Sequence, residues 1–343
     1  MSGSRPRLLV GAPHRDADLA RLWYRAYLRD LLPALSDTAD VTTVLYCDAG
    51  REGFDAERFP GAALEEPGPS ARDFVEFYDT LLDRGADAVL ILDADVFVLD
   101  GAWVASHLAR LAEPRVAGVS FLRRAEGPGV YALLVRPPDW AALPRPVFAP
   151  LYDDLSGWPR ITTVQPAQDA ARKLRAAGKR VLNAEPGRPG EKVADFHGTT
   201  NLRLTRSLFD ETVPAEDFVA FLADSPYLVM AAHDNLLLGA LHRAVFGEPF
   251  AVGASGGHLS GSATEEELCR AAAAIPSTAK LAWAEAAVRR SRAAFEGLLA
   301  REGIRVEVPR LFRADARVRA SAYRLARPAW VLAKRLAGAG GAP

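Results

Sequence analysis

The sequence predicts an α/β fold in which a mostly parallel sheet is flanked by helices and followed by a helical C-terminal extension. Three observations predict it. Residues 88–92 are a continuous apolar run, which is typical of a parallel strand buried on both faces. Residues 7–46 read as strand, loop, helix and strand, the opening order of many α/β domains. Residues from about 265 to 302 have a helical pattern that begins at a capping box, Thr264 to Glu267.

The elements follow in order from the spacing of apolar residues. Strands are expected at residues 7–12, 41–46, 88–92, 116–121, 129–135 and 180–183, with the strand at 129–135 beside that at 88–92. Helices are expected at about 18–35, from a cap at Ser70 to an end at Gly85, and at about 103–111, 170–177, 218–232 and 265–302. We expect a catalytic domain over residues 1–262 and a helical extension with a basic tail over 263–343.

Composition excludes several classes of protein. The chain has 343 residues with 42 Lys and Arg against 43 Asp and Glu, a net charge of −1, so it is not an electrostatic nucleic-acid binder. Its two cysteines, Cys47 and Cys269, form no disulfide framework and favour a reducing compartment. No run approaches the ~18 apolar residues of a membrane span, and the first apolar run is too short for a signal peptide. A cytoplasmic location is therefore expected.

The strand at 88–92 stops at Asp93-Ala94-Asp95. Two carboxylates one residue apart are costly inside a core, so they belong at the carboxyl end of the strand. Ligands bind at that edge of open α/β sheets, and paired acids there suit a hard divalent cation. The simpler interpretation is that the two acids end the strand and cap the next turn.

The order of strand, acid, any residue, acid and apolar residues over 88–98 resembles the Asp-x-Asp motif of GT-A glycosyltransferases, members of the nucleotide-diphospho-sugar transferase superfamily. The resemblance covers roughly Arg7 to Arg203 and implies a Rossmann-like GT-A fold. It implies Mn²⁺ or Mg²⁺ bound by Asp93 and Asp95, with a nucleoside diphosphate sugar as the donor. Asp93 and Ala94 would also contact the donor.

By the same resemblance, the loops after the first two strands hold the nucleoside. Pro13, His14, Arg15 and Asp48 would line its pocket, and Arg72 would touch the nucleotide. The alternatives are ordinary loop residues and a solvated surface arginine.

A His followed by Gly at 197–198 resembles the third metal ligand of many GT-A enzymes. Neutral imidazole from His197 can join carboxylates around Mn²⁺, which accepts both oxygen and nitrogen. A surface histidine, or a histidine hydrogen-bonded in the core, is the alternative.

Two acids compete for the role of catalytic base. Asp169 begins a helix that is followed by Gly178-Lys179-Arg180-Val181, an order that resembles the segment carrying the catalytic carboxylate of inverting GT-A enzymes. The usual Glu-Asp pair is Gln168-Asp169 here, and an Asp at a helix start is also a good partner for the helix dipole. Asp234, between His233 and Asn235, is the second candidate, or it ties two helices together.

Two further segments point to partners. Residues 137–166 are rich in Pro, Trp and Tyr, and such a long irregular segment suits an acceptor pocket or a structural loop. The basic segment 310–335, interleaved with apolar residues, suits peripheral contact with anionic lipid on the inner membrane face, or docking of a partner. It can equally pack on the catalytic domain.

Three enzyme classes were compared. A sugar-phosphate nucleotidyltransferase needs a Gly-rich loop with a basic residue after the first strand, which Gly11-Ala12-Pro13-His14 does not supply. A phosphatase of the Asp-x-Asp type carries its acids on the first strand, whereas a whole β-α-β unit precedes Asp93 here. The sequence therefore favours a metal-dependent, inverting glycosyltransferase acting on a small molecule, natural product or glycan. A retaining enzyme of the same fold, the nucleotidyltransferase and a non-enzymatic binding module remain the alternatives.

Overall fold

The computed structural model describes residues 5–14, 16–47, 53–66, 74–124, 127–128, 132–148, 166–184, 191–196, 215–224, 226–248, 265–275 and 278–306. The chain separates into two compact units, residues 1–193 and 194–343, and each is considered by itself. The boundary predicted after residue 262 falls within the second unit, outside the described residues.

A seven-stranded sheet forms the centre of the first unit. Its strand order is β10 (Arg180–Asn183), β6 (Val116–Ser120), β9 (Ala132–Val135), β4 (Ala88–Leu92), β1 (Arg7–His14), β2 (Asp40–Cys47) and β3 (Ala62–Glu65). Only β9, among these strands, runs against its neighbours β4 and β6; the other neighbouring pairs are parallel. The predicted α/β class is confirmed, as is the position of the 129–135 strand beside the acidic one.

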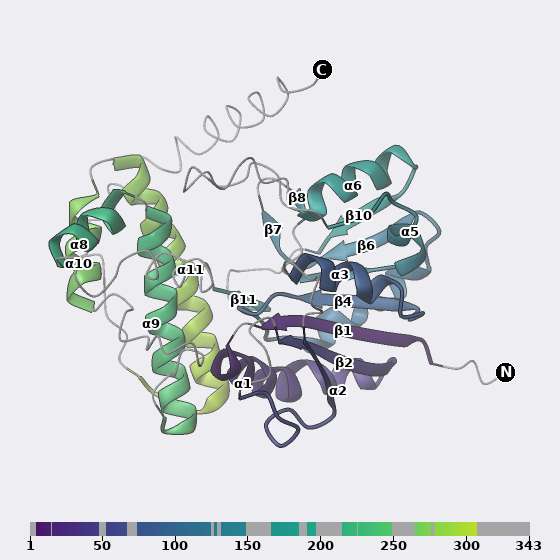
Figure 1. Ribbon diagram of the computed structural model, residues 1–343, viewed down its shortest axis with the longest axis horizontal. Coiled ribbons are helices and arrows are strands. Elements are labelled where there is room, and N and C mark those ends of the chain that lie inside the picture. Colours follow the sequence, from purple (N-terminus) through teal and green to yellow (C-terminus); the bar gives the residue numbers. More distant parts are fainter. Residues whose placement is uncertain are drawn as a thin grey trace. The chain divides into compact units, whose positions relative to one another are not determined.

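Successive side chains of β1 point to opposite faces of the sheet and pack against a layer of helices on each face. Leu9 belongs to the core cluster with α3 (Phe74–Leu82), α5 (Pro137–Ala141) and α6 (Pro166–Ala176), which lie on one face of the sheet (Figure 1). On the same face, a Cβ on Gly11 would lie 2.2 Å from Leu81 Cδ1, so glycine allows the helix to approach. His14 packs against Trp23 of α1 (Ala17–Ala26), which covers the other face together with α2 (Leu32–Ser36).

The helix predicted at 18–35 is interrupted. A π-helical turn, Tyr27–Leu31, separates α1 from α2. Pro33 has no N–H to donate to the carbonyl group four residues earlier, which favours a widened turn just before it. The turn also lies against α4 (Gly101–Ser106), where a Cβ on Gly101 would lie 2.2 Å from Asp30 O.

Short elements complete the first unit. β5 (Val96–Val98) follows the acidic turn, and Asp100 then caps α4 by accepting a hydrogen bond from Trp103 N at 2.9 Å. A 3₁₀ helix, Leu108–Ala112, follows α4, so the helix predicted at 103–111 is present as two pieces. β7 (Arg123–Arg124) and β8 (Gly127–Pro128) form a small antiparallel pair, and β11 (Val193–Asp195) begins at the last residue of the unit.

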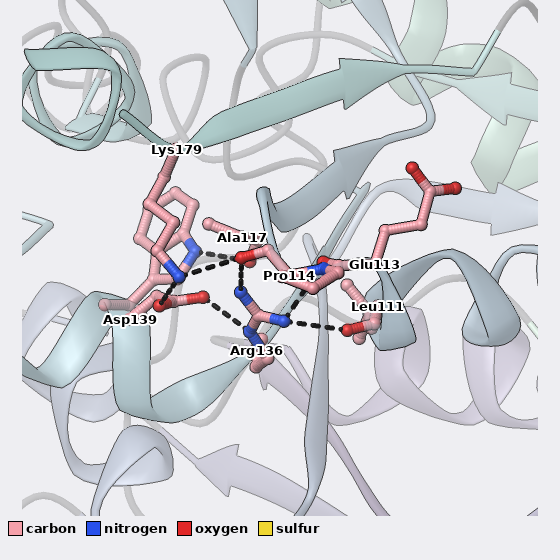
Figure 2. Close-up of polar contacts among 8 residues, drawn as sticks. Leu111, Glu113, Pro114, Ala117, Arg136, Asp139 and Lys179 are labelled. Atoms are coloured by element: carbon pink, nitrogen blue, oxygen red, sulfur yellow. Dashed lines mark hydrogen bonds and ion pairs between the residues drawn. The ribbon is translucent and has the colours of Figure 1, made fainter. Parts of the chain in front are cut away.

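A polar cluster closes the amino edge of the sheet, where β6 and β10 begin and the antiparallel β9 ends (Figure 2). Arg136 donates to three carbonyl oxygens, those of Leu111 (3.0 Å), Glu113 (3.2 Å) and Pro114 (2.9 Å). Its Nε lies 2.5 Å from Asp139 Oδ2, and Lys179 Nζ lies 2.9 Å from Asp139 Oδ1. These contacts pair each charge with a partner, so we interpret the cluster as structural.

The second unit contains four described helices, α8 (Ala215–Asp224), α9 (Pro226–Phe246), α10 (Glu265–Ala274) and α11 (Thr278–Glu302). One apolar cluster joins Leu228 and Ala232 of α9 to Leu281 and Val288 of α11. Among the described residues, no helix has both the length and the apolar character that crossing a membrane requires. The basic segment 310–335 lies outside the described residues.

Candidate active site

Three parallel strands end together at the carboxyl edge of the sheet. β1 ends at His14, β2 ends at Cys47, and these two residues are register partners. β4, on the other side of β1, ends at Leu92 directly before Asp93-Ala94-Asp95. Because β1, β2 and β4 are parallel, the acidic turn and the end of β1 lie at the edge where α/β sheets bind ligands.

Two hydrogen bonds to Asp93, one to its carbonyl group and one to its side chain, define the acidic turn between β4 and β5. Asp93 O accepts from Val96 N at 3.1 Å, and Asp93 Oδ1 accepts from Ala94 N at 2.9 Å. Asp93, Ala94 and Asp95 are half-buried, whereas all five residues of β4 are buried. The strand therefore delivers two carboxylates to a place that solvent and ligands can reach.

The oxygen donors of this turn fit a hard cation. Mg²⁺-type sites commonly use one or two carboxylates and complete their shell with water and substrate phosphates. Within the described ranges, no group of three or more His, Cys, Asp or Glu side chains gathers in a metal-binding arrangement. His197 lies outside the described residues.

His14 is buried at the end of β1. Its side chain is 1% exposed, its ring centroid lies 5.1 Å from that of Trp23, and neither ring nitrogen has a hydrogen-bond partner in the described structure. Burial lowers the pKa of His14 from 6.5 to about 3, because charging the ring inside the protein costs solvation energy. Neighbouring Pro13 is buried too, while Arg15, Asp48 and Arg72 lie outside the described residues. The nucleoside pocket stays a prediction.

The buried imidazole predicts how stability depends on pH. Between about pH 6.5 and pH 3 the unfolded chain binds a proton at His14 that the folded chain excludes, so folding is progressively weakened as pH falls. Relative to His14→Phe, the wild type should lose up to about 1.4 kcal/mol of unfolding free energy per pH unit in this window, and nothing above it. Urea denaturation of both proteins from pH 8 to pH 4.5 measures this. A constant difference across the range would contradict it.

Asp169 lies in the first turn of α6. Lys179 and Arg180 follow this helix closely and enter β10 at the amino edge, so the start of α6 lies toward the carboxyl edge. Its carboxylate is half-buried and pairs with two cations of its own helix, Arg172 Nη2 at 3.2 Å and Lys173 Nζ at 2.7 Å. The structure thus places Asp169 and the acidic turn toward the same edge of the sheet.

Asp234 lies in the core of the second unit with 0% exposure. Its Oδ2 accepts from Ser291 Oγ at 2.9 Å, which links α9 to α11, and its Oδ1 lies 3.4 Å from Nδ1 of His233. This is the arrangement expected of an acid that ties two helices together. The catalytic alternative for Asp234 stays a prediction without a described contact to support it.

The aromatic segment predicted at 137–166 is described only at its ends. Asp79 of α3 anchors its first part by accepting from Val147 N (2.9 Å) and Phe148 N (3.3 Å). Burial is the main cause that raises the pKa of Asp79, although these amide groups lower it. Residues 149–165 lie outside the described part of the chain.

Two contacts at this edge were missed by the sequence analysis, and the second of them has a recognisable signal. Trp23 falls in the apolar stripe of its helix, and nothing in that pattern shows that its N–H bonds to Val96 O at 2.9 Å. Asp16, before an apolar helical pattern, is a recognisable N-cap, and its Oδ1 accepts from Asp18 N and Leu19 N, both at 2.9 Å.

No protein-family model matches the chain, and no curated protein matches it. Solved structures similar to it include a mannosyltransferase from Pyrobaculum calidifontis in complex with GDP-mannose and Mn²⁺, at 17% identity and a TM-score of 0.43, over 97% of this chain and 86% of that one. Glucosyl-3-phosphoglycerate synthase from Mycobacterium tuberculosis, in complex with Mn²⁺, UDP-glucose and glycerol 3-phosphate, is 12% identical with a TM-score of 0.36. The match covers 54% of this chain and 73% of that one. A 4-diphosphocytidyl-2C-methyl-D-erythritol synthase is 14% identical with a TM-score of 0.35, and the match covers 61% of this chain and 100% of that one.

Proposed function

We propose that this protein is a metal-dependent glycosyltransferase that moves a sugar from a nucleoside diphosphate donor to an acceptor. One observation carries the proposal: a buried parallel strand ends in two half-buried carboxylates at the ligand-binding edge of the sheet, in a turn closed by the hydrogen bond from Val96 N to Asp93 O. Asp93 and Asp95 would hold a Mn²⁺ or Mg²⁺ ion there. When bound, the ion supplies charge neutralisation for the departing diphosphate.

Asp169 is the proposed base. Its carboxylate would accept the proton of the acceptor hydroxyl as that oxygen attacks the anomeric carbon. Attack from the face opposite the departing diphosphate would invert the configuration of that carbon. The position of Asp169 in the first turn of α6 supports this role, because backbone N–H groups at a helix start favour the ionised carboxylate that a base needs. A retaining transfer is the alternative within the same class.

A screen of nucleoside diphosphate sugars tests the proposal. The expected result is slow, metal-dependent release of nucleoside diphosphate from one donor with water as the acceptor, abolished by EDTA. A sugar-phosphate nucleotidyltransferase would instead release pyrophosphate from a nucleoside triphosphate and a sugar phosphate. Undiminished hydrolysis in EDTA would contradict the metal-dependent mechanism.

A further inference from the structure

The side chain of Trp23 joins the first helix to the acidic turn. Its indole N–H donates to the carbonyl oxygen of Val96 at 2.9 Å, a contact across 73 positions of the chain. Val96 directly follows Asp95, and its own N–H donates to Asp93 O. Both backbone groups of Val96 therefore take part in fixing the turn that carries the two carboxylates.

Aromatic contacts hold the indole ring in place. The ring of Tyr27 stacks on it with centroids 5.2 Å apart and planes 5° from parallel, and the ring of His14 lies 5.1 Å away at 60°. The hydroxyl of Tyr27 is in turn hydrogen-bonded to Thr43 Oγ1 of β2 at 2.6 Å. Trp23 is 2% exposed, so it acts on the turn from inside the protein, and its hydrogen bond to Val96 is the described polar contact through which it does so.

We propose that Trp23 is a positioning residue for cation binding at the acidic turn. The inference rests on the proposed function, because it concerns the same site. The affinity for a cation depends on how well its carboxylate ligands are oriented, and outer contacts that orient metal ligands commonly change that affinity by about 10–100-fold. Trp23 supplies such a contact from α1, a helix far from the acidic turn in sequence.

The chain provides a matched control in Trp140. It is 0% exposed, its indole N–H donates to a strand carbonyl, Ala117 O, at 2.8 Å, and its ring stacks on Phe148 at 5.3 Å. It differs in location, because Ala117 lies near the start of β6, at the amino edge of the sheet. Trp23→Phe and Trp140→Phe thus remove the same kind of bond from opposite edges.

The test measures Mn²⁺ binding to the full chain by the loss of the free-ion electron paramagnetic resonance signal, with Mn²⁺ as the only added ligand. We expect Trp23→Phe to raise the dissociation constant by about 10-fold and Trp140→Phe to leave it unchanged. Thermal unfolding of both variants should show similar destabilisation. Wild-type Mn²⁺ affinity in Trp23→Phe, or an equal loss in both variants, would overturn the proposal.

Two additions keep the test decisive. If Trp23→Phe does not fold, a chain in which benzothienylalanine replaces Trp23 removes the N–H and keeps the ring shape, with the same expected loss. Asp95→Asn separates the two hypotheses. If the wild type binds Mn²⁺ and Asp95→Asn does not, then wild-type Mn²⁺ affinity in the Trp23 variant overturns the positioning role of Trp23 and leaves the proposed function standing. If the wild type binds no Mn²⁺, the proposed function and this inference both fail.

Discussion

Asp95→Asn is expected to lower metal-dependent turnover by about 10³-fold or more, because the charge stabilisation that a bound cation supplies is worth several kcal/mol. The amide keeps the size of the side chain and removes the negative charge that the cation needs. The fold should persist, since Asp95 is half-buried and follows the strand β4 rather than packing inside it.

Asp87→Asn is the control for this change. Asp87 lies at the amino end of the same strand and accepts from Arg7 N at 2.7 Å, a bond that an amide oxygen can also accept. Turnover and its dependence on Mn²⁺ should match the wild type. Undiminished turnover in Asp95→Asn, measured with the donor found in the screen, would remove this residue from the site.

Asp169→Asn is expected to lower kcat by about 10²–10⁴-fold with donor affinity little changed, the usual effect of losing a general base. The lost ion pairs with Arg172 and Lys173 join partly exposed groups, whose contribution to stability is only about 0–1 kcal/mol, so unfolding is not the expected cause. Steady-state kinetics with a defined acceptor, together with the anomeric configuration of the product, measures the effect.

Asp139→Asn is the matched control for the base. Asp139 is also an acid in the first turn of a helix and also contacts two cations, Arg136 and Lys179, but at the amino edge of the sheet. The Asp139→Asn variant should be less stable than the wild type and keep the wild-type kcat. A near-normal kcat in Asp169→Asn, or a product that retains the donor's configuration, would exclude Asp169 as the base of an inverting transfer.

The sequence predicted six strands of the seven-stranded sheet from their apolar runs, and it predicted the acidic turn because carboxylates cannot continue such a run. The edge strand β3 was not predicted, because none of its four residues is buried and it carries no long apolar run. The direction of β9 could not be read in the same way, since a short buried strand has the same composition in either direction. The interruption of the first helix became clear only in the structure, although Pro33 was a visible signal for it.

Contacts between distant residues set the limit of the sequence analysis at the site. His14 was predicted to line a pocket, and its burial beneath Trp23 depends on the packing of a helix that the local sequence does not position. The hydrogen bond between Asp234 and Ser291, 57 positions away, could not be predicted from the local sequence. The spacing of apolar residues identifies which residues are buried. It does not identify which buried polar groups form hydrogen bonds with one another, because those pairs are set by the folded chain.

The most direct test of the central claim is calorimetric binding of the donor found in the screen, with and without Mn²⁺. The acidic turn is proposed to hold the diphosphate through the cation. Removing Mn²⁺ with EDTA should therefore weaken donor binding by about 100-fold, and Asp95→Asn should do the same in the presence of Mn²⁺. Equal donor affinity in EDTA and in Mn²⁺ would contradict the account.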